Sequence, residues 1–171
     1  MKKLALKDLS ALFSLIAETQ QLYLPAQKSG QTNYARYEEG VKFDLSTLKT
    51  VKSAKEIFFP QSETLYTMYK DGKKIRITQQ ELQSESFVAF GVRGCDVKGI
   101  EVLDKVFLSN PVDTFYKARR DHGTIVSLAC GEPEESSFCT VFEVQPENPA
   151  GDVTAWIVGD ELYWRANTEK G

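Results

Sequence analysis

The sequence has few of the residues and segments that define several large functional classes. Its 171 residues include only one histidine and three cysteines. No apolar run approaches the roughly 18 residues that a helix needs to span a bilayer. The N-terminal stretch is interrupted by Lys7, Asp8 and Glu18, so it lacks the continuous apolar region of a signal peptide. We therefore expect a cytoplasmic protein that does not enter the membrane.

Neither sign of charge is in large excess. The 21 lysines and arginines are mixed with 24 aspartates and glutamates, which leaves a net charge of -3. Without a basic stripe, binding to DNA or RNA is not expected. The composition, 42% hydrophobic and 26% charged, is typical of a soluble globular protein. A chain of this length can bury a substantial core, and we predict a single domain over residues 1–171.

The N-terminal segment is predicted to be a helix followed by irregular or extended chain. Four apolar residues at helical spacing predict a helix over residues 7–19: Leu9, Leu12, Phe13 and Ile16. The following residues, 22–40, mix β-favouring aromatic residues with Pro25 and Gly30. This pattern favours a loose hairpin or an irregular connection over a second helix.

Two tight β-hairpins are indicated further along the chain. Asp71-Gly72 lies between "LYTMYK" and "KKIRIT", which is the signal for a two-residue turn between strands. Gly159-Asp160 interrupts "VTAWIVGDELYWRA" in the same way. Both hairpins add antiparallel strands to the predicted architecture.

The centre of the chain predicts a strand-helix-strand crossover. Residues 86–92 are continuously apolar, as in a strand covered on both faces, and a helix with Asp96 as N-cap follows. A second, basic helix over residues 112–123 is expected to end at Gly123, before a buried strand that finishes at Cys130. We therefore predict an α/β fold, with α+β as the alternative, and a mixed β-sheet.

The three cysteines are the residues most able to carry chemistry. Cys95 and Cys130 follow the two predicted strands of the crossover, and Cys139 lies nine residues further on in a Gly- and Pro-containing loop. Ligands collect outside the carboxyl ends of parallel strands, so the three thiols could converge at one sheet edge. The simpler interpretation is that they are small buried hydrophobic residues, as free cysteines often are. An adjacent helix N-terminus and Arg93 are expected to favour the thiolate at Cys95, the form that ligates soft metals or attacks electrophiles.

Other sites that use cysteine or glycine fit the sequence poorly. Structural zinc commonly uses paired C-x2-C knuckles, and none is present. A thiol nucleophile would need a histidine base, but His122 is expected to be a solvated loop residue. The turn at residues 91–96 has the wrong glycine spacing for dinucleotide binding.

Several segments, taken in order, resemble one known family. They are "FFPQSETLY", "FGVRGCDVKGIEVLDKVFL", "DTFYKARR", "TIVSLACGEP" and "SSFC". Over about residues 55–171 the chain resembles the iron–sulfur beta subunits of cytoplasmic NiFe hydrogenases and sulfhydrogenases, and the corresponding iron–sulfur subunit of anaerobic sulfite reductase. The resemblance implies a non-catalytic relay that passes single electrons through 4Fe-4S clusters, between two partner subunits, one of flavin or ferredoxin type and one catalytic.

The chain also departs from that family's pattern. Members usually continue into a ferredoxin-like half with two C-x2-C-x2-C-x3-C-P runs, which this sequence lacks, so the resemblance covers the N-terminal half. Members often carry proline in place of Gly94, and a further cysteine in place of Ser137.

The resemblance implies that Cys95, Cys130 and Cys139 would ligate an iron–sulfur cluster. The fourth position would then fall to Ser137, to solvent or to a partner, or the cluster would contain three irons, or the site has been lost. The alternative function is a metal-free docking module for partner subunits. The basic pair Arg119-Arg120, similar to one in the family, is expected to lie on a solvated helix face.

Overall fold

A seven-stranded mixed sheet forms the centre of the computed structural model, which describes residues 1–132 and 134–171. The strand order is β1-β9-β8-β7-β6-β2-β3. The four central strands, β8, β7, β6 and β2, pair in parallel. Strand β9 pairs antiparallel with β8, β3 pairs antiparallel with β2, and β1 pairs antiparallel with β9. This arrangement confirms the predicted α/β fold with a mixed sheet. The strands are β1 (Lys2–Ala5), β2 (Gln21–Lys28), β3 (Gln31–Arg36), β6 (Phe87–Val92), β7 (Gly123–Leu128), β8 (Val153–Val158) and β9 (Glu161–Ala166).

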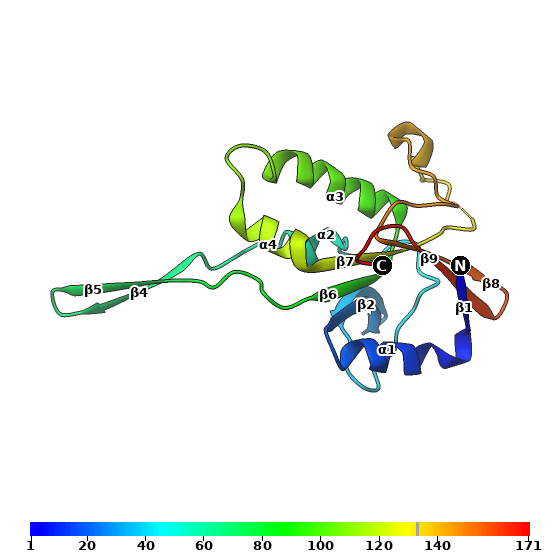
Figure 1. Cartoon of the computed structure of the whole chain (residues 1–171), viewed down its shortest axis with the longest axis horizontal. Helices are drawn as coiled ribbons and strands as arrows, with labels where there is room; N and C mark the ends of the chain where they lie inside the picture. The colour runs from blue at the N-terminus through cyan, green and yellow to red at the C-terminus, as the bar shows by residue number, and fades with distance from the viewer. Residues whose placement is uncertain (133) are drawn as a thin grey trace.

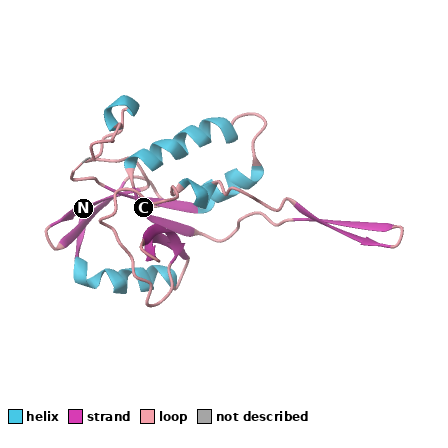
Figure 2. Ribbon diagram, turned by 180° about the vertical axis from the view of Figure 1, so that it is seen from behind, coloured by secondary structure: helices cyan, strands magenta, loops and turns pink. Residues whose placement is uncertain are grey.

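Helices cover both faces of the sheet (Figures 1 and 2). Helix α1 (Leu9–Ala17), preceded by the short 3-10 helix η1 (Leu6–Asp8), lies on one face, and this confirms the helix predicted over 7–19. On the other face lie α2 (Lys55–Phe58), α3 (Gly94–Phe107) and α4 (Thr114–His122). Across residues 1–132 and 134–171, no helix has both the length and the apolar character that crossing a bilayer requires.

The strand pair β6 and β7 separates two hydrophobic cores. Val88 and Phe90 pack with Phe13 on the side of α1, whereas Phe87 and Ala89 belong to the core under α3 and α4. All six residues of β6 are buried. The continuous apolar run is therefore explained by burial on both faces, as the crossover prediction required.

A β-bulge at Gly91 redirects the end of β6. Phe90 pairs with Val126 and Val92 pairs with Ser127, so Gly91 is the extra residue on its strand. Its φ of +81° is readily adopted only by glycine, and a Cβ there would lie 3.3 Å from the side chain of Leu45. Because of the extra residue, Val92 joins the core under α3, and the chain enters that helix directly afterwards.

One predicted helix boundary was wrong, and another was confirmed. Helix α3 begins at Gly94 with Arg93 in the N-cap position, so Asp96 lies inside the first turn and is not the cap. The Asp96 carboxylate instead accepts a hydrogen bond from Ser53 Oγ at 2.5 Å. Gly123 does follow α4, but it is in extended conformation and opens β7.

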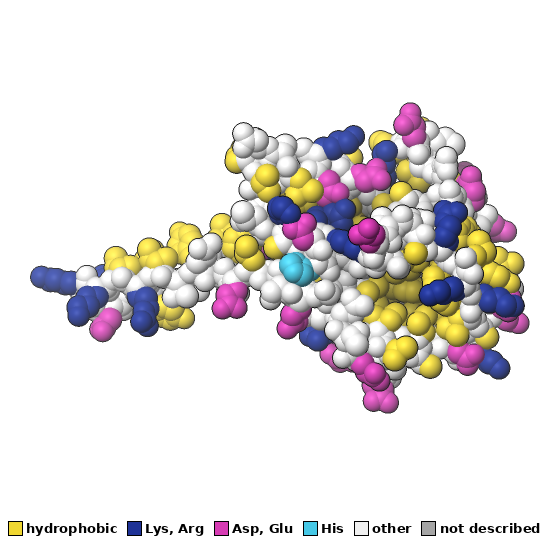
Figure 3. All heavy atoms as spheres, in the orientation of Figure 1, with side chains coloured by type: hydrophobic (Ala, Val, Ile, Leu, Met, Phe, Trp, Pro, Cys, Tyr) yellow, Lys and Arg dark blue, Asp and Glu magenta, His cyan; other side chains and the backbone are white. Residues whose placement is uncertain are grey.

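Both predicted tight hairpins form, and one of them leaves the body of the molecule. Strands β4 (Tyr66–Asp71) and β5 (Lys74–Gln79) make a two-stranded arm that projects from one end (Figure 1). Every residue of both strands is exposed, and apolar side chains run along the arm (Figure 3). Its turn is Gly72-Lys73, one residue later than predicted, because Asp71 pairs with Lys74. The pair β8–β9 confirms the other tight hairpin. Of the two alternatives left open for residues 22–40, the structure shows the hairpin, formed by β2 and β3.

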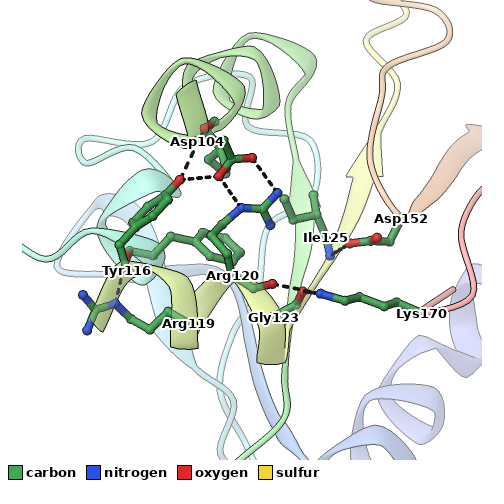
Figure 4. A network of polar contacts seen from close by, with 10 residues as sticks. Asp104, Tyr116, Arg119, Arg120, Gly123, Ile125, Asp152 and Lys170 are labelled. Atoms are coloured by element: carbon green, nitrogen blue, oxygen red, sulfur yellow. Dashed lines mark hydrogen bonds and ion pairs between the residues drawn. The ribbon is translucent and has the colours of Figure 1, made fainter. Parts of the chain in front are cut away.

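Arg119 and Arg120 of α4 bind neighbouring elements, so the prediction that they lie on a solvated helix face was wrong. Arg120 donates to both carboxylate oxygens of Asp104 on α3, at 2.7 and 2.9 Å, and Tyr116 Oη donates to Asp104 at 2.7 Å (Figure 4). Arg119 donates to the Phe58 carbonyl at 2.6 Å and forms an ion pair with Glu63. The two arginines therefore link α4 to α3 and to the end of α2.

The Asp104 network should make part of the stability of the fold dependent on pH. Burial alone would raise the pKa of Asp104, but hydrogen bonds from Arg120 and Tyr116 and the arginine charge outweigh it, so the pKa is lowered. A lowered pKa means that the unfolded chain binds the proton more tightly. The stabilisation is therefore present above the unfolded pKa of about 3.9 and is lost as the pH falls through the folded pKa.

We expect Asp104→Asn to lower the free energy of unfolding at pH 7 by about 1–3 kcal/mol, because it weakens charge-assisted hydrogen bonds of a half-buried pair. Urea unfolding at a series of pH values measures this. The difference from the parent should shrink below about pH 4. The matched control is Asp121→Asn, which breaks an exposed ion pair with Lys117 and should cost at most about 0.5 kcal/mol. Equal costs for the two variants would contradict a special role for Asp104.

Candidate functional site

Cys95 lies at the carboxyl end of β6, as the second residue of α3. The helix start approaches a later loop closely. A Cβ on Gly94 would lie 2.9 Å from the side chain of Val144 and 3.1 Å from that of Pro149. The absence of a side chain at Gly94 therefore allows the loop of residues 144–149 to pack directly beside Cys95.

Cys130 and Cys139 come from the segment that crosses the same edge of the sheet. Cys130 lies two residues beyond β7, and its N–H donates to the Pro146 carbonyl at 2.8 Å. Cys139 opens the short 3-10 helix η2 (Cys139–Phe142), and its carbonyl accepts from Val144 N–H at 2.9 Å. The chain thus folds back on itself after β7, and the cysteines all lie beyond strand ends.

Two neighbouring hollows divide the candidate ligands. Cys95, Ser137 and Cys139 line one cavity of about 530 Å³, together with apolar residues that include Phe138. Cys130 lines a larger hollow of about 880 Å³ instead. Within the part of the chain that the structure describes, no three His, Cys, Asp or Glu side chains are already arranged to hold a metal ion. The structure therefore brings Cys95, Ser137 and Cys139 to one cavity and leaves Cys130 beside it.

The thiol of Cys95 is not activated in the way the sequence predicted. Burial of the sulfur against the cavity and then the charge of Asp96 raise the pKa of Cys95, although the residue as a whole is exposed. A hydrogen bond from the backbone of Asp96, which is the contribution of the helix start, acts in the opposite direction but is outweighed. Thiolate charge on Cys130 and Cys139 adds smaller upward contributions to the pKa of Cys95.

Arg93 is turned away from Cys95 and into the protein. Only 7% of the residue is exposed. One terminal nitrogen, Nη2, donates to the carbonyls of Leu45 and Thr47 at 2.6 and 2.9 Å. The other, Nη1, donates to the Ala129 carbonyl at 3.1 Å and lies 4.0 Å from Cys130 Sγ. Arg93 therefore joins the chain after β3 to the end of β7, and its nearest thiol is Cys130.

The charge of this guanidinium has no counter-ion among the described residues. Arg93 forms no ion pair with any of their carboxylates, and its Nε is buried without a hydrogen-bond partner. Burial raises the pKa of Cys130, while the charge of Arg93 and its hydrogen bond to the sulfur lower it, and burial prevails. A buried cation beside a half-buried thiol is an environment suited to an anionic group.

Three lysines add positive charge to the cavity that holds Cys95 and Cys139. Lys49, Lys55 and Lys98 all line it. Lys49 forms an ion pair with Glu134, and Lys98 lies 3.5 Å from Glu101. Sequence reasoning missed these lysines because they come from three separate segments, and no local pattern distinguishes them from solvated surface lysines.

Comparison with known proteins finds a relative for most of the chain. Over 127 residues the sequence is 30% identical to sulfhydrogenase 2 subunit beta of Pyrococcus furiosus. The chain is homologous to a sulfhydrogenase beta subunit. The matched part is 74% of this chain but 36% of the relative, so the chain spans about a third of the length of that protein. No model of a known protein family matches the sequence, and no solved structure matches it.

The chemistry of the three thiols would suit an iron–sulfur cluster. Thiolates are the usual ligands of such clusters, and a cluster bound by them is anionic, so it would supply the missing counter-charge for Arg93. The unpaired Nε of Arg93 and the shared cavity of Cys95 and Cys139 are consistent with this. The three sulfurs would have to move to ligating distances when the cluster binds, because metal binding is coupled to local folding.

The raised pKa values of Cys95 and Cys130 predict slow alkylation near neutral pH. Only the thiolate reacts, so the rate of iodoacetamide labelling at each cysteine should rise with pH with a midpoint above the ordinary value of about 8.5. Mass spectrometry of the digested protein gives the midpoint for each site. The same chain in concentrated urea is the control and should return to the ordinary value. A midpoint below about 8.5 in the folded protein would contradict the assigned environments.

Proposed function

We propose that this chain is an electron-transfer subunit, or part of one, in a multi-subunit oxidoreductase. The family proposed is that of the beta subunits of NiFe hydrogenases and sulfhydrogenases, with the iron–sulfur subunit of anaerobic sulfite reductase as the other candidate. The observation that carries the proposal is the placement of three thiols at one edge of the sheet, beside a buried guanidinium without a counter-ion among the described residues. Homology to a protein named as a sulfhydrogenase subunit supports it.

The proposed cluster ligands are Cys95, Cys130 and Cys139. Ser137 lines the same cavity as Cys95 and Cys139, so it can offer its hydroxyl at the fourth position of a 4Fe-4S cluster. Solvent, a partner residue or a three-iron cluster are the other ways to complete the site. When bound, an iron–sulfur cluster supplies reversible one-electron chemistry, and no catalytic role is assigned to this chain.

The surrounding residues would set the properties of the proposed site. Positive charge from Arg93 and from the cavity lysines favours the more negative, reduced state, and so raises the reduction potential. The aromatic rings of Phe138 and Phe142, which are exposed on their outer sides, give the cavity a partly apolar lining. Arg93 also anchors the residue before Cys130 through the Ala129 carbonyl.

The proposed partners are two further subunits, one of flavin or ferredoxin type and one catalytic. These assignments extend the resemblance, because the chain spans 36% of its sulfhydrogenase relative. A cytoplasmic location is part of the same proposal.

The second candidate is a metal-free docking module for the same kind of complex. Two observations favour it. Serine stands at position 137, where the family often has cysteine, and the described residues contain no preformed group of three metal ligands. In this alternative the domain binds and orients neighbouring subunits, and the iron–sulfur clusters are bound by other polypeptide segments.

Anaerobic reconstitution with iron and sulfide should distinguish the two functions. We expect the parent chain to take up iron and acid-labile sulfide, to become brown and to give a paramagnetic resonance spectrum. Single replacements by alanine at Cys95, Cys130 or Cys139 should each reduce iron uptake severely, because each removes one of three thiolates. Ser137→Cys should raise the yield of four-iron over three-iron cluster, since it adds a fourth thiolate.

The matched control for the added thiol is Ser109→Cys, which places a new cysteine at an exposed position just beyond the end of α3. It should leave the cluster yield and type unchanged. A parent chain that stays colourless and iron-free after anaerobic reconstitution, while its circular dichroism shows a folded protein, would favour the docking module.

A further inference from the structure

The projecting arm formed by residues 66–79 combines an exposed apolar face with a basic tip. In the register of the hairpin, Met68 pairs with Ile77 and Lys70 pairs with Ile75, so one face of the arm is largely apolar. Five of its large apolar side chains are between 55% and 63% exposed: Tyr66, Met68, Tyr69, Ile75 and Ile77. Such a stretch is costly to leave in water, and an isolated two-stranded hairpin is marginally stable without a contact surface.

The arm also has the opposite charge to the body. It carries Lys70, Lys73, Lys74 and Arg76 against Asp71, a formal charge of +3. Since the whole chain carries -3, the remaining residues carry -6. Figure 3 shows the lysines and arginines gathered toward the tip of the arm. The contact surface that suits this arm is therefore apolar in part and acidic.

The same chain carries exposed acidic and apolar residues between positions 132 and 147, which we name the glutamate patch. There is no lysine or arginine between Arg120 and Arg165. Glu134 is paired with Lys49, whereas the other glutamates of the patch form no ion pair among the described residues. Three exposed apolar residues accompany them: Phe138, Val141 and Phe142 are 66%, 70% and 61% exposed. The patch consists of Glu132, Glu134, Glu135, Glu143 and Glu147 together with these three apolar residues.

The arm and the glutamate patch of one molecule cannot meet. The arm projects from one end of the body, and η2, which carries part of the patch, lies toward the opposite end (Figure 1). Two copies related by a two-fold axis could instead place each arm on the other copy's patch. The resulting dimer has closed two-fold symmetry. It buries two arms and two glutamate patches, whereas a single arm contact would bury one of each.

We propose that this chain self-associates by reciprocal docking of the arm of each copy on the glutamate patch of the other. Apolar contact between the arm face and Phe138, Val141 and Phe142 supplies the attraction. The lysines and glutamates around that contact fix its orientation and speed its formation. The proposal does not depend on a bound cluster.

Sedimentation of the purified chain over a range of concentrations tests the proposal. The expected mass rises from 19.3 kDa toward twice that value. We expect a dissociation constant of roughly 1–100 μM, as for a weak, transient interface. Added salt should weaken the association, because the charges involved are exposed. A chain that remains at the monomer mass throughout this range would overturn the proposal and leave the arm to another partner.

Variants with reversed charges test whether the arm and the glutamate patch make the contact. The arm variant carries Lys73→Glu with Lys74→Glu, which changes the charge of the arm from +3 to -1. The patch variant carries Glu135→Lys, Glu143→Lys and Glu147→Lys, which changes the charge of the patch from -5 to +1. Each alone should raise the dissociation constant about tenfold or more, because attraction between exposed charges becomes repulsion. Mixing the two variants should restore association, since both contacts of the mixed pair again join opposite charges.

The matched control is Lys28→Glu with Lys42→Glu, two exposed lysines outside both surfaces. It makes the same change in net charge as the arm variant. Because neither lysine lies in the proposed contact, the dissociation constant should stay close to that of the parent chain. Circular dichroism checks that each variant is folded. If the control weakens association as much as the arm variant does, or if mixing fails to restore it, the docking proposal is wrong.

Discussion

The parallel pairing of β6 with β7, buried on both faces, is the constraint on which the rest of the structure depends. Each strand contributes side chains to two cores. A shift of either strand by one residue would therefore move its side chains from one core to the other and disrupt the packing of both. Because the two strands are parallel, their carboxyl ends lie at the same edge of the sheet. That edge is where the chain places Arg93, Cys95 and Cys130. The position of the candidate site thus follows directly from the packing of the centre.

Arg93 connects that packing to the chemistry of the edge. The bulge at Gly91 sets the direction in which the chain leaves β6, and Arg93 then reaches the carbonyls of Leu45, Thr47 and Ala129. A guanidinium held by backbone carbonyls keeps its charge without a carboxylate partner. Its charge is therefore available to an anionic group beside Cys130. The same hydrogen bonds also hold three separate segments of the chain together.

Charge is distributed unevenly along the molecule despite a small net value. Cations gather on the β4–β5 arm and around the cavity of Cys95 and Cys139, while glutamates concentrate in the loop after β7. The exposed glutamates and the cavity lysines come from different segments, and Lys49 and Glu134 join the two groups by an ion pair. The loop that carries Cys139 and Ser137 is therefore involved in both proposals, first as a source of ligands and second as a contact surface.

Elements with local sequence signals were predictable from the residues alone. The spacing of Leu9 and Phe13 predicted α1, the continuous apolar run of residues 86–92 predicted a doubly covered strand, and Asp71-Gly72 predicted the hairpin of the arm to within one residue. The placement of Cys95 and Cys130 beyond two strand ends followed from the same patterns. Short-range backbone preferences and burial of one or both faces are sufficient for such predictions.

Features that depend on partners far away in the sequence could be seen only in the folded chain. Arg93 was expected to act on Cys95, but its hydrogen-bond acceptors lie in two other segments and draw it toward Cys130. Arg120 was expected to be solvated, but Asp104 on the neighbouring helix holds it. The cavity shared by Cys95, Ser137 and Cys139 and lined by lysines likewise assembles residues from separate parts of the chain. A side chain's orientation and pKa are set by the groups that folding brings to it, and those groups leave no periodic signal in its own segment.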